Sequence, residues 1–522
     1  GREVTQGGGN GANGKVVVTW AVPYVSQNSV DPAFVSNWNA NPGGIGSAPL
    51  NFTNNNQAFI IHNGHTMTTT GTAWTVSGTG TKVVIQSGGT LTETASAISL
   101  SANTALQVDN GALLNHNVNS LTIFNITVTF GNTSTVSYGL AGAQTVYPST
   151  YGNLILSGSL VKTTTGVTVN GTLSMEGAAT ASAAPTCGAN TTLQYNTATS
   201  RTAGVEWINT FASTGGVIIA NTGVITLNAA KVFNSGIPLT INSGASLNTS
   251  AANNYALTFG GNFINNGGTL TANASPVTIA STAATQSIAG ITTTGTVSMT
   301  KTAGIATFTG NVNGNGLTNN GTGGTLNLGT GLTHTLTGTW TNSNGTLNGG
   351  SSLLNIGTNG TFTAGTFIPG TGTVNYYAAG AQTVAGVSYN NLNISGSGTK
   401  SLGGSATVQG ILTLSGGTFA VGPNALTLNG PSIAGTPNNL STAASSTLVF
   451  GGSSTGITVP SGVASLNNLT ISNSNGISLS GPLSSGSLTF TSGSLNTTSV
   501  NLLTITNTGT GSIGGVSATS YI

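Results

Sequence analysis

The sequence carries very little charge. Eight of its 522 residues are Lys or Arg and six are Asp or Glu, which gives a formal net charge of +2. A typical soluble domain has about 25% charged residues, so Thr, Ser, Asn and Gly must supply most of the polar surface here. The few basic residues form no cluster, and this excludes the phosphate-binding footprint of a nucleic-acid-binding protein.

Cysteine and long apolar runs are almost absent. Cys187 is the single cysteine, so no disulfide can form within the chain, and we interpret it as a small structural residue and not as a reactive thiol. No run approaches the ~18 apolar residues that span a bilayer, so we expect no membrane span. The start, Gly1-Arg2-Glu3, reads as a mature N-terminus from which a signal peptide has been removed.

Glycine is plentiful, with 79 residues, and it separates short runs in which apolar and small polar side chains alternate. This alternation is typical of strands with one buried face, and helical periodicity is missing throughout. The clearest stretch is 373–430, where Leu412, Phe419 and Leu426 recur about every seven residues and fit the three faces of one coil. Asn-Gly pairs also suit antiparallel hairpins, so a β-sandwich stays open as the less favoured fold.

Imperfect repeats run through most of the chain. The pattern at 82–91 returns at 105–114, which sets the repeat offset (105 − 82 = 23). Repeats of this length correspond to one coil of a solenoid, because each coil buries its apolar side chains against its neighbours. The sequence therefore predicts an all-β fold, a parallel β-solenoid (β-helix) with irregular coils of ~20–23 residues over 56–522. At ~4.8 Å per stacked strand, the array would be a rod on the order of 110–125 Å long.

A longer cassette also repeats. TVSYGLAGAQTV at 135–146 returns much later in the chain as TVNYYAAGAQTV at 373–384 (373 − 135 = 238). Lys162, Lys301 and Lys400 take equivalent positions after copies of this cassette. Because lysine is rarely buried, we predict a solvated corner there and not three active sites.

Residues 1–55 differ from the rest, with several prolines and two of the five tryptophans. An array of coils leaves its first core layer open, and a concentration of large apolar side chains suits a cap over that layer. We predict an N-terminal cap at 1–55. The alternative is a docking surface for another subunit, formed by Trp20, Phe34 and Trp38.

Stacked coils place like residues above like, and this accounts for the low charge. Columns of charge would repel, whereas Asn, Thr and Ser can form hydrogen-bonded ladders. Uncharged edges also favour self-association, either head to tail or lateral. One strand, at 333–341, would place five threonines on one face and His334, Leu336 and Trp340 on the other. Regular threonine ladders bind ice in some solenoids, but general solvation is the favoured interpretation of this single strand.

Enzymatic chemistry finds little support in the sequence. β-Helix enzymes that degrade polysaccharides need carboxylates clustered across neighbouring coils. Glu93 and Asp109 are separated by less than one coil length (109 − 93 = 16), so adjacent coils could bring them together, but we favour solvation of both at the surface. We therefore predict no catalytic residues and a protein that is not an enzyme.

Cofactor and metal motifs are incomplete. Residues 9–15 match the first seven positions of a P-loop, but Val16 stands where Ser or Thr would hold Mg²⁺. His62 and His65 form the one close histidine pair, and no Cys or carboxylate near them in sequence completes a metal shell. We predict neither a cofactor nor a metal.

The cassette at 372–418, GTVNYYAAGAQTVAGVSYNNLNISGSGTKSLGGSATVQGILTLSGGT, resembles those of the long β-strand-repeat surface proteins of Bacteroidetes-type bacteria. FIIHNGHTMT at 59–68 is similar to the start of such arrays, and the resemblance covers most of 57–522. It implies an adhesin-like protein that the type IX system secretes and that is attached outside the cell. Because no charged, compact sorting domain follows, we expect the chain to be a portion of a longer protein or a processed product.

Together these observations predict a secreted structural protein of the cell surface. It would be a rigid extracellular rod that acts as an adhesin, a stalk or a self-assembling filament subunit, with self-association and surface glycans as the expected contacts. The second hypothesis is a polysaccharide- or ice-binding solenoid module. The third is a polysaccharide-degrading β-helix enzyme.

Overall fold

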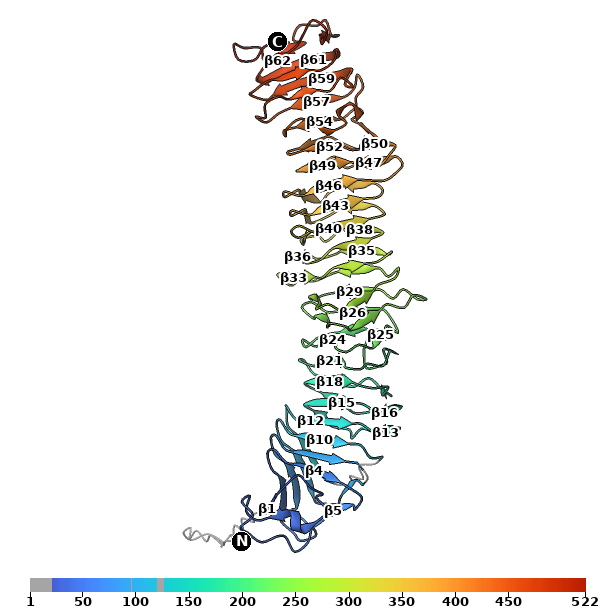
Figure 1. Cartoon of the computed structure of the whole chain (residues 1–522), viewed down its shortest axis with the longest axis vertical. Helices are drawn as coiled ribbons and strands as arrows, with labels where there is room; N and C mark the ends of the chain where they lie inside the picture. The colour runs from blue at the N-terminus through green and yellow to red at the C-terminus, as the bar shows by residue number, and fades with distance from the viewer. Residues whose placement is uncertain (1–20, 95, 120–125) are drawn as a thin grey trace, which may run out of the picture. The chain divides into compact units, whose positions relative to one another are not determined.

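The computed structural model describes residues 21–94, 96–119 and 126–522. Within these ranges the chain consists of short strands, and its helical content is limited to two 3-10 turns. Parallel stacked coils form a β-solenoid of about 22 turns (Figure 1). The predicted fold class is therefore confirmed, and the β-sandwich is excluded.

Each coil is made of short strands on different sheets, as the spacing of apolar residues predicts. Leu412, Phe419 and Leu426 are buried on three successive strands, which belong to three different sheets. Gly417 and Gly422 form the corners between these strands with φ of 61° and 62°, a conformation that glycine adopts without steric cost. The strands are β52 (Leu412–Leu414), β53 (Thr418–Ala420) and β54 (Ala425–Leu428).

The chain divides into two compact units. Unit 1 contains the described residues up to 228 together with 240–247 and 266–269, and unit 2 contains 229–239, 248–265 and 270–522. In unit 1, one sheet carries the strands used below, in the order β4 (Thr66–Thr69), β7 (Thr90–Glu93), β10 (Leu113–His116), β12 (Thr135–Tyr138), β15 (Asn153–Leu156), β18 (Thr172–Met175) and β21 (Thr192–Tyr195).

Unit 2 has the same construction. One of its sheets runs in the order β34 (Ile291–Thr292), β37 (Val312–Gly314), β40 (Thr333–Leu336), β43 (Leu353–Ile356), β46 (Thr373–Tyr376), β49 (Asn391–Ile394), β52 and β55 (Ala434–Gly435). Most inward positions of this sheet hold Leu, Ile, Val or Tyr, and most outward positions hold Thr or Asn. The alternation read from the sequence is therefore the alternation between core and surface.

The first described residues pack onto the array. β1 (Val22–Ser26) pairs in parallel with β3 (Gln57–Ile61) and antiparallel with β2 (Trp38–Asn39). Trp38 is fully buried, with its ring centroid 5.2 Å from that of Trp74. It therefore packs in the core of its own chain, and both the cap and the docking surface stay predictions. Phe34 is 50% exposed, so its role in docking stays a prediction, and Trp20 lies outside the described residues.

Outward polar side chains form the predicted ladders. In unit 2, Thr335, Asn355, Asn375 and Asn393 occupy the same position on successive strands. Asn375 Nδ2 donates to Asn355 Oδ1 at 2.9 Å, so amides on neighbouring coils bond to each other. A column of charged groups could not do this, and the low charge is thus explained by stacking.

The threonine stretch at 333–341 does not form one strand. Thr333 and Thr335 lie on β40 and Thr341 lies on β41 (Trp340–Asn342), which belongs to a different sheet, and the other two threonines lie between the strands. The single five-threonine face is therefore wrong, because the chain turns a corner at Gly338. His334, Leu336 and Trp340 are all buried.

Candidate functional site

The lysines of the repeated cassette are buried and not solvated. Lys162 and Lys400 are both 0% exposed. The Nζ atom of Lys400 donates to the carbonyl oxygens of Ala378, Gly380 and Ser397, each at 2.7 Å. The predicted solvated corner is wrong, because carbonyl groups of the turns around each amine take the place of water. Burial lowers the pKa of both amines.

A glutamine completes the arrangement around each lysine. Gln144 pairs with Lys162 across neighbouring strands, and Gln144 Nε2 donates to the carbonyl oxygens of His116 and Val118 at 2.7 and 3.0 Å. Lys162 Nζ in turn donates to Leu140 O at 2.7 Å. Gln144 thus bonds to the coil that precedes its own, and Lys162 bonds to the coil that contains Gln144. Each Gln–Lys pair therefore joins three successive coils.

Lys301 differs from the other two lysines. The register places Ala306, not Lys301, beside Gln286, so the predicted equivalence of the three positions is wrong. Lys301 is nevertheless buried, and its Nζ atom donates to Ala283 O at 3.0 Å. It reaches the turn that precedes Gln286 from the connection between β35 (Thr296–Met299) and β36 (Ile305–Phe308). All three lysines therefore stabilise turns.

Two pairs of buried tyrosines repeat with the cassette. The hydroxyl groups of Tyr138 and Tyr151 are 2.9 Å apart, and those of Tyr376 and Tyr389 are 3.2 Å apart. Tyr151 donates to Tyr147 O at 2.6 Å, and Tyr389 makes the corresponding bond, at 2.7 Å, to Ala385 O. In each cassette, a hydrogen bond between two buried tyrosine hydroxyl groups therefore joins two parts of one coil.

Because these tyrosines are buried, we expect the protein to lose stability at high pH. Burial raises the pKa of Tyr138 and of Tyr376 to about 12, from 10.0 in the unfolded chain. The folded protein then holds these protons more tightly, so the stabilisation is complete below pH 10 and declines as pH rises from 10 to 12. Two pH units correspond to about 3 kcal/mol for each tyrosine. We expect tyrosinate absorbance in a base titration to rise together with unfolding. In guanidinium, where the chain is already unfolded, the same absorbance should rise near pH 10.

Glu93 is buried beside a histidine in the core of unit 1. It pairs with His116 on the next coil, both side chains are 0% exposed, and His116 Nδ1 hydrogen bonds to Glu93 Oε2. Glu93 Oε1 also accepts from Ile98 N at 2.6 Å. The predicted solvation of Glu93 is therefore wrong. Asp109 belongs to a separate network, in which it accepts from Gln107 Nε2 at 2.6 Å, so the two carboxylates do not form a catalytic pair.

A second buried carboxylate, Glu206, also holds its own chain. Its Oε1 atom accepts from the Tyr195 hydroxyl at 2.9 Å and from Gly204 N at 2.8 Å. Arg201 Nη2 lies 3.5 Å from the same oxygen. No repeated sequence pattern indicates this cluster, because its members have no counterpart in the other repeats.

The remaining candidates from the sequence carry no chemistry that the structure supports. His65 Nδ1 lies 2.8 Å from Ser26 Oγ, and burial raises the pKa of the Cys187 thiol. Across residues 21–94, 96–119 and 126–522, no group of three or more His, Cys, Asp or Glu could hold a metal ion. The P-loop-like stretch 9–15 lies outside the described residues.

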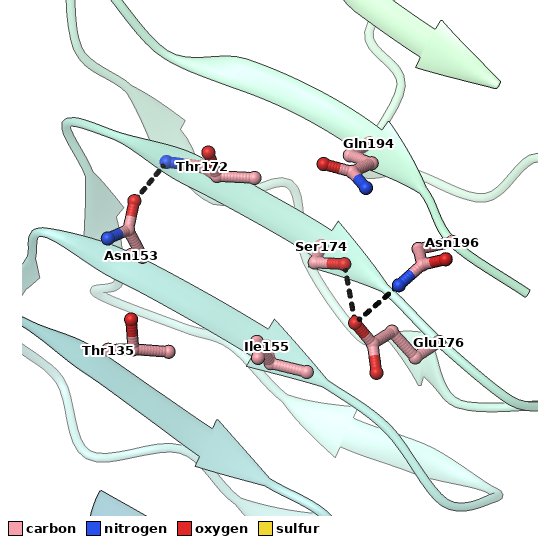
Figure 2. Close-up of a pocket in the computed structure, with 8 residues that line it drawn as sticks. All are labelled: Thr135, Asn153, Ile155, Thr172, Ser174, Glu176, Gln194 and Asn196. Carbon is pink, nitrogen blue, oxygen red and sulfur yellow. Dashed lines mark hydrogen bonds between the residues drawn. The ribbon is translucent and has the colours of Figure 1, made fainter. Parts of the chain in front are cut away.

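One hollow on the outward face of unit 1 exposes a carboxylate. It has a volume of about 300 Å³ and extends over β12, β15, β18 and β21 and the turns that follow them (Figure 2). Glu176 Oε1 accepts from Ser174 Oγ at 2.9 Å and from Asn196 Nδ2 at 3.1 Å. The lining residues are Thr135, Asn153, Ile155, Thr172, Ser174, Glu176, Gln194 and Asn196. Sequence reasoning missed this surface, because four different repeats contribute to it.

Comparisons with known proteins add no further identification. The chain matches no protein-family model, no curated protein and no solved structure. In the part of the chain that the structure describes, no helix has the length and apolar character needed to cross a membrane.

Proposed function

We propose that this chain is a secreted structural protein of the cell surface that acts as an adhesin, a stalk or a subunit of an extracellular filament. One observation carries the proposal. Several side chains of types that are often catalytic, such as Lys400 and Glu93, are fully buried and bound to groups of their own chain. Their chemistry serves the scaffold, and this supports a protein that is not an enzyme.

The outward faces support self-association as part of this function. In unit 2, Ile305 and Ile368 lie at outward positions of one sheet and are 44% and 47% exposed. The other outward residues on these strands are Thr, Ser and Asn, so no charge opposes lateral contact between copies. We propose that copies associate through such faces.

The proposal predicts where the protein is found. Brief protease treatment of intact cells that express it should release peptides from the solenoid and leave a cytosolic marker protein intact. Immunogold labelling of unpermeabilised cells should give the same location, and negative-stain images of the purified chain would then tell single particles from continuous filaments. A protein that is protected from protease until the cells are lysed would refute the proposed function.

A further inference from the structure

We propose that the Glu176 hollow is a binding site for an uncharged glycan, in which a carboxylate and amides bind the sugar hydroxyls. The inference rests on the proposed surface function and names the class of ligand that such a protein would contact.

Glu176 is held in place and retains one free oxygen. Ser174 and Asn196 both donate to Oε1, and Asn221 Nδ2 donates to Asn196 Oδ1 at 3.3 Å, which fixes the amide in turn. Oε2 has no partner in the described part of the chain, and Figure 2 shows that Glu176 projects from the end of β18. A carboxylate fixed on one side presents the other as an acceptor for a ligand hydroxyl.

Neighbouring amides supply the complementary donors. Within the described ranges, neither side-chain amide atom of Gln194 has a hydrogen-bond partner, although the residue itself pairs with β18 on one side and with β24 (Val217–Ile219) on the other. Asn153 uses Oδ1 to accept from Thr172 N at 2.9 Å, which leaves its Nδ2 atom free. An amide offers a donor and an acceptor side by side, which suits a pair of adjacent hydroxyls.

The shape and charge of the hollow narrow the class of ligand. Ile155 lies among the polar side chains in Figure 2 and can contact the C–H face of a sugar ring. Glu176 is the one charged residue among the eight that line the hollow, so phosphate, sulfate and uronate groups would be repelled. The site lies on a sheet face whose main chain is already hydrogen bonded, so an added peptide strand has no edge to pair with.

Calorimetric titration of the full chain tests this inference, with neutral hexasaccharides of β-1,4-glucan, β-1,4-mannan and β-1,4-xylan and with anionic polygalacturonate as probes. We expect at least one neutral hexasaccharide to bind and polygalacturonate not to bind. The double variant Glu176→Ala/Gln194→Ala should weaken binding at least tenfold. The matched control Gln107→Ala/Asp109→Ala, which removes the same chemical groups outside the hollow, should leave the affinity unchanged.

Each of three results would overturn the inference: no neutral hexasaccharide binds, polygalacturonate binds in preference, or the two double variants behave alike. Circular dichroism spectra that match the wild type would show that the variants remain folded. A protein that is exposed on cells but binds no neutral hexasaccharide refutes this inference alone. A protein that is confined within cells refutes the proposed function, whatever the titration shows.

Discussion

Lys400→Met should lower the local free energy of unfolding around the second cassette by about 3–5 kcal/mol. The substitution keeps most of the apolar stem and removes the amine, so the carbonyl oxygens of Ala378, Gly380 and Ser397 lose their donor. A hydrogen bond contributes about 0.5–1.5 kcal/mol, and more when its donor is charged; three are lost here, two of them at exposed turn residues. Because coils in a solenoid unfold locally, hydrogen exchange of the amides in 376–402 is the appropriate measurement.

Two variants serve as controls for this result. Lys82→Met makes the same change at a lysine that is partly exposed and whose amine has no hydrogen-bond partner in the described residues, so exchange should change little. Lys162→Met should reproduce the effect in the first cassette, and the two changes should add because the two lysines belong to different compact units. Exchange in 376–402 that is equal in Lys400→Met and the wild type would show that the amine does not hold the turn.

The cassette shows which parts of the fold can be predicted from sequence. The period of the repeats set the length of a coil, and the spacing of Leu412, Phe419 and Leu426 indicated three faces. Both follow from apolar alternation, which any stacked coil must have. The burial of Lys400 could not be read in this way, since lysine is exposed in most proteins and the carbonyls that surround it are not visible in a sequence.

The sequence contains one indication that Glu93 is buried beside His116. Glu93 and His116 are separated by the same offset that relates 82–91 to 105–114 (116 − 93 = 23). Each also occupies an inward position of the alternation, so the repeat predicts that they stack on neighbouring coils. The Glu176 hollow has no such signal, because its depth depends on the side-chain conformations of residues from four repeats.

His116→Leu should destabilise unit 1 locally by about 3–5 kcal/mol, since it breaks a buried Glu–His pair and leaves the Glu93 carboxyl group, which water does not reach, without its Nδ1 partner. Adding Glu93→Gln should then recover about 2 kcal/mol, because a buried amide that lacks one partner costs less than a buried carboxyl group that lacks the same partner. Its Oε1 atom can still accept from Ile98 N. Hydrogen exchange of the amides in 90–116 measures both effects.

The recovery distinguishes an electrostatic role of His116 from simple packing. His334 is the matched control, because it is equally buried but bonds only to backbone atoms, with Nε2 2.8 Å from Leu328 O and Nδ1 accepting from Val312 N at 3.1 Å. Glu93→Gln added to His334→Leu should therefore give no recovery, since the two sites share no partner. If Glu93→Gln fails to improve His116→Leu, the cost arises from the cavity that the imidazole leaves. The Glu93–His116 hydrogen bond would then contribute no more than the packing of the ring against Tyr138.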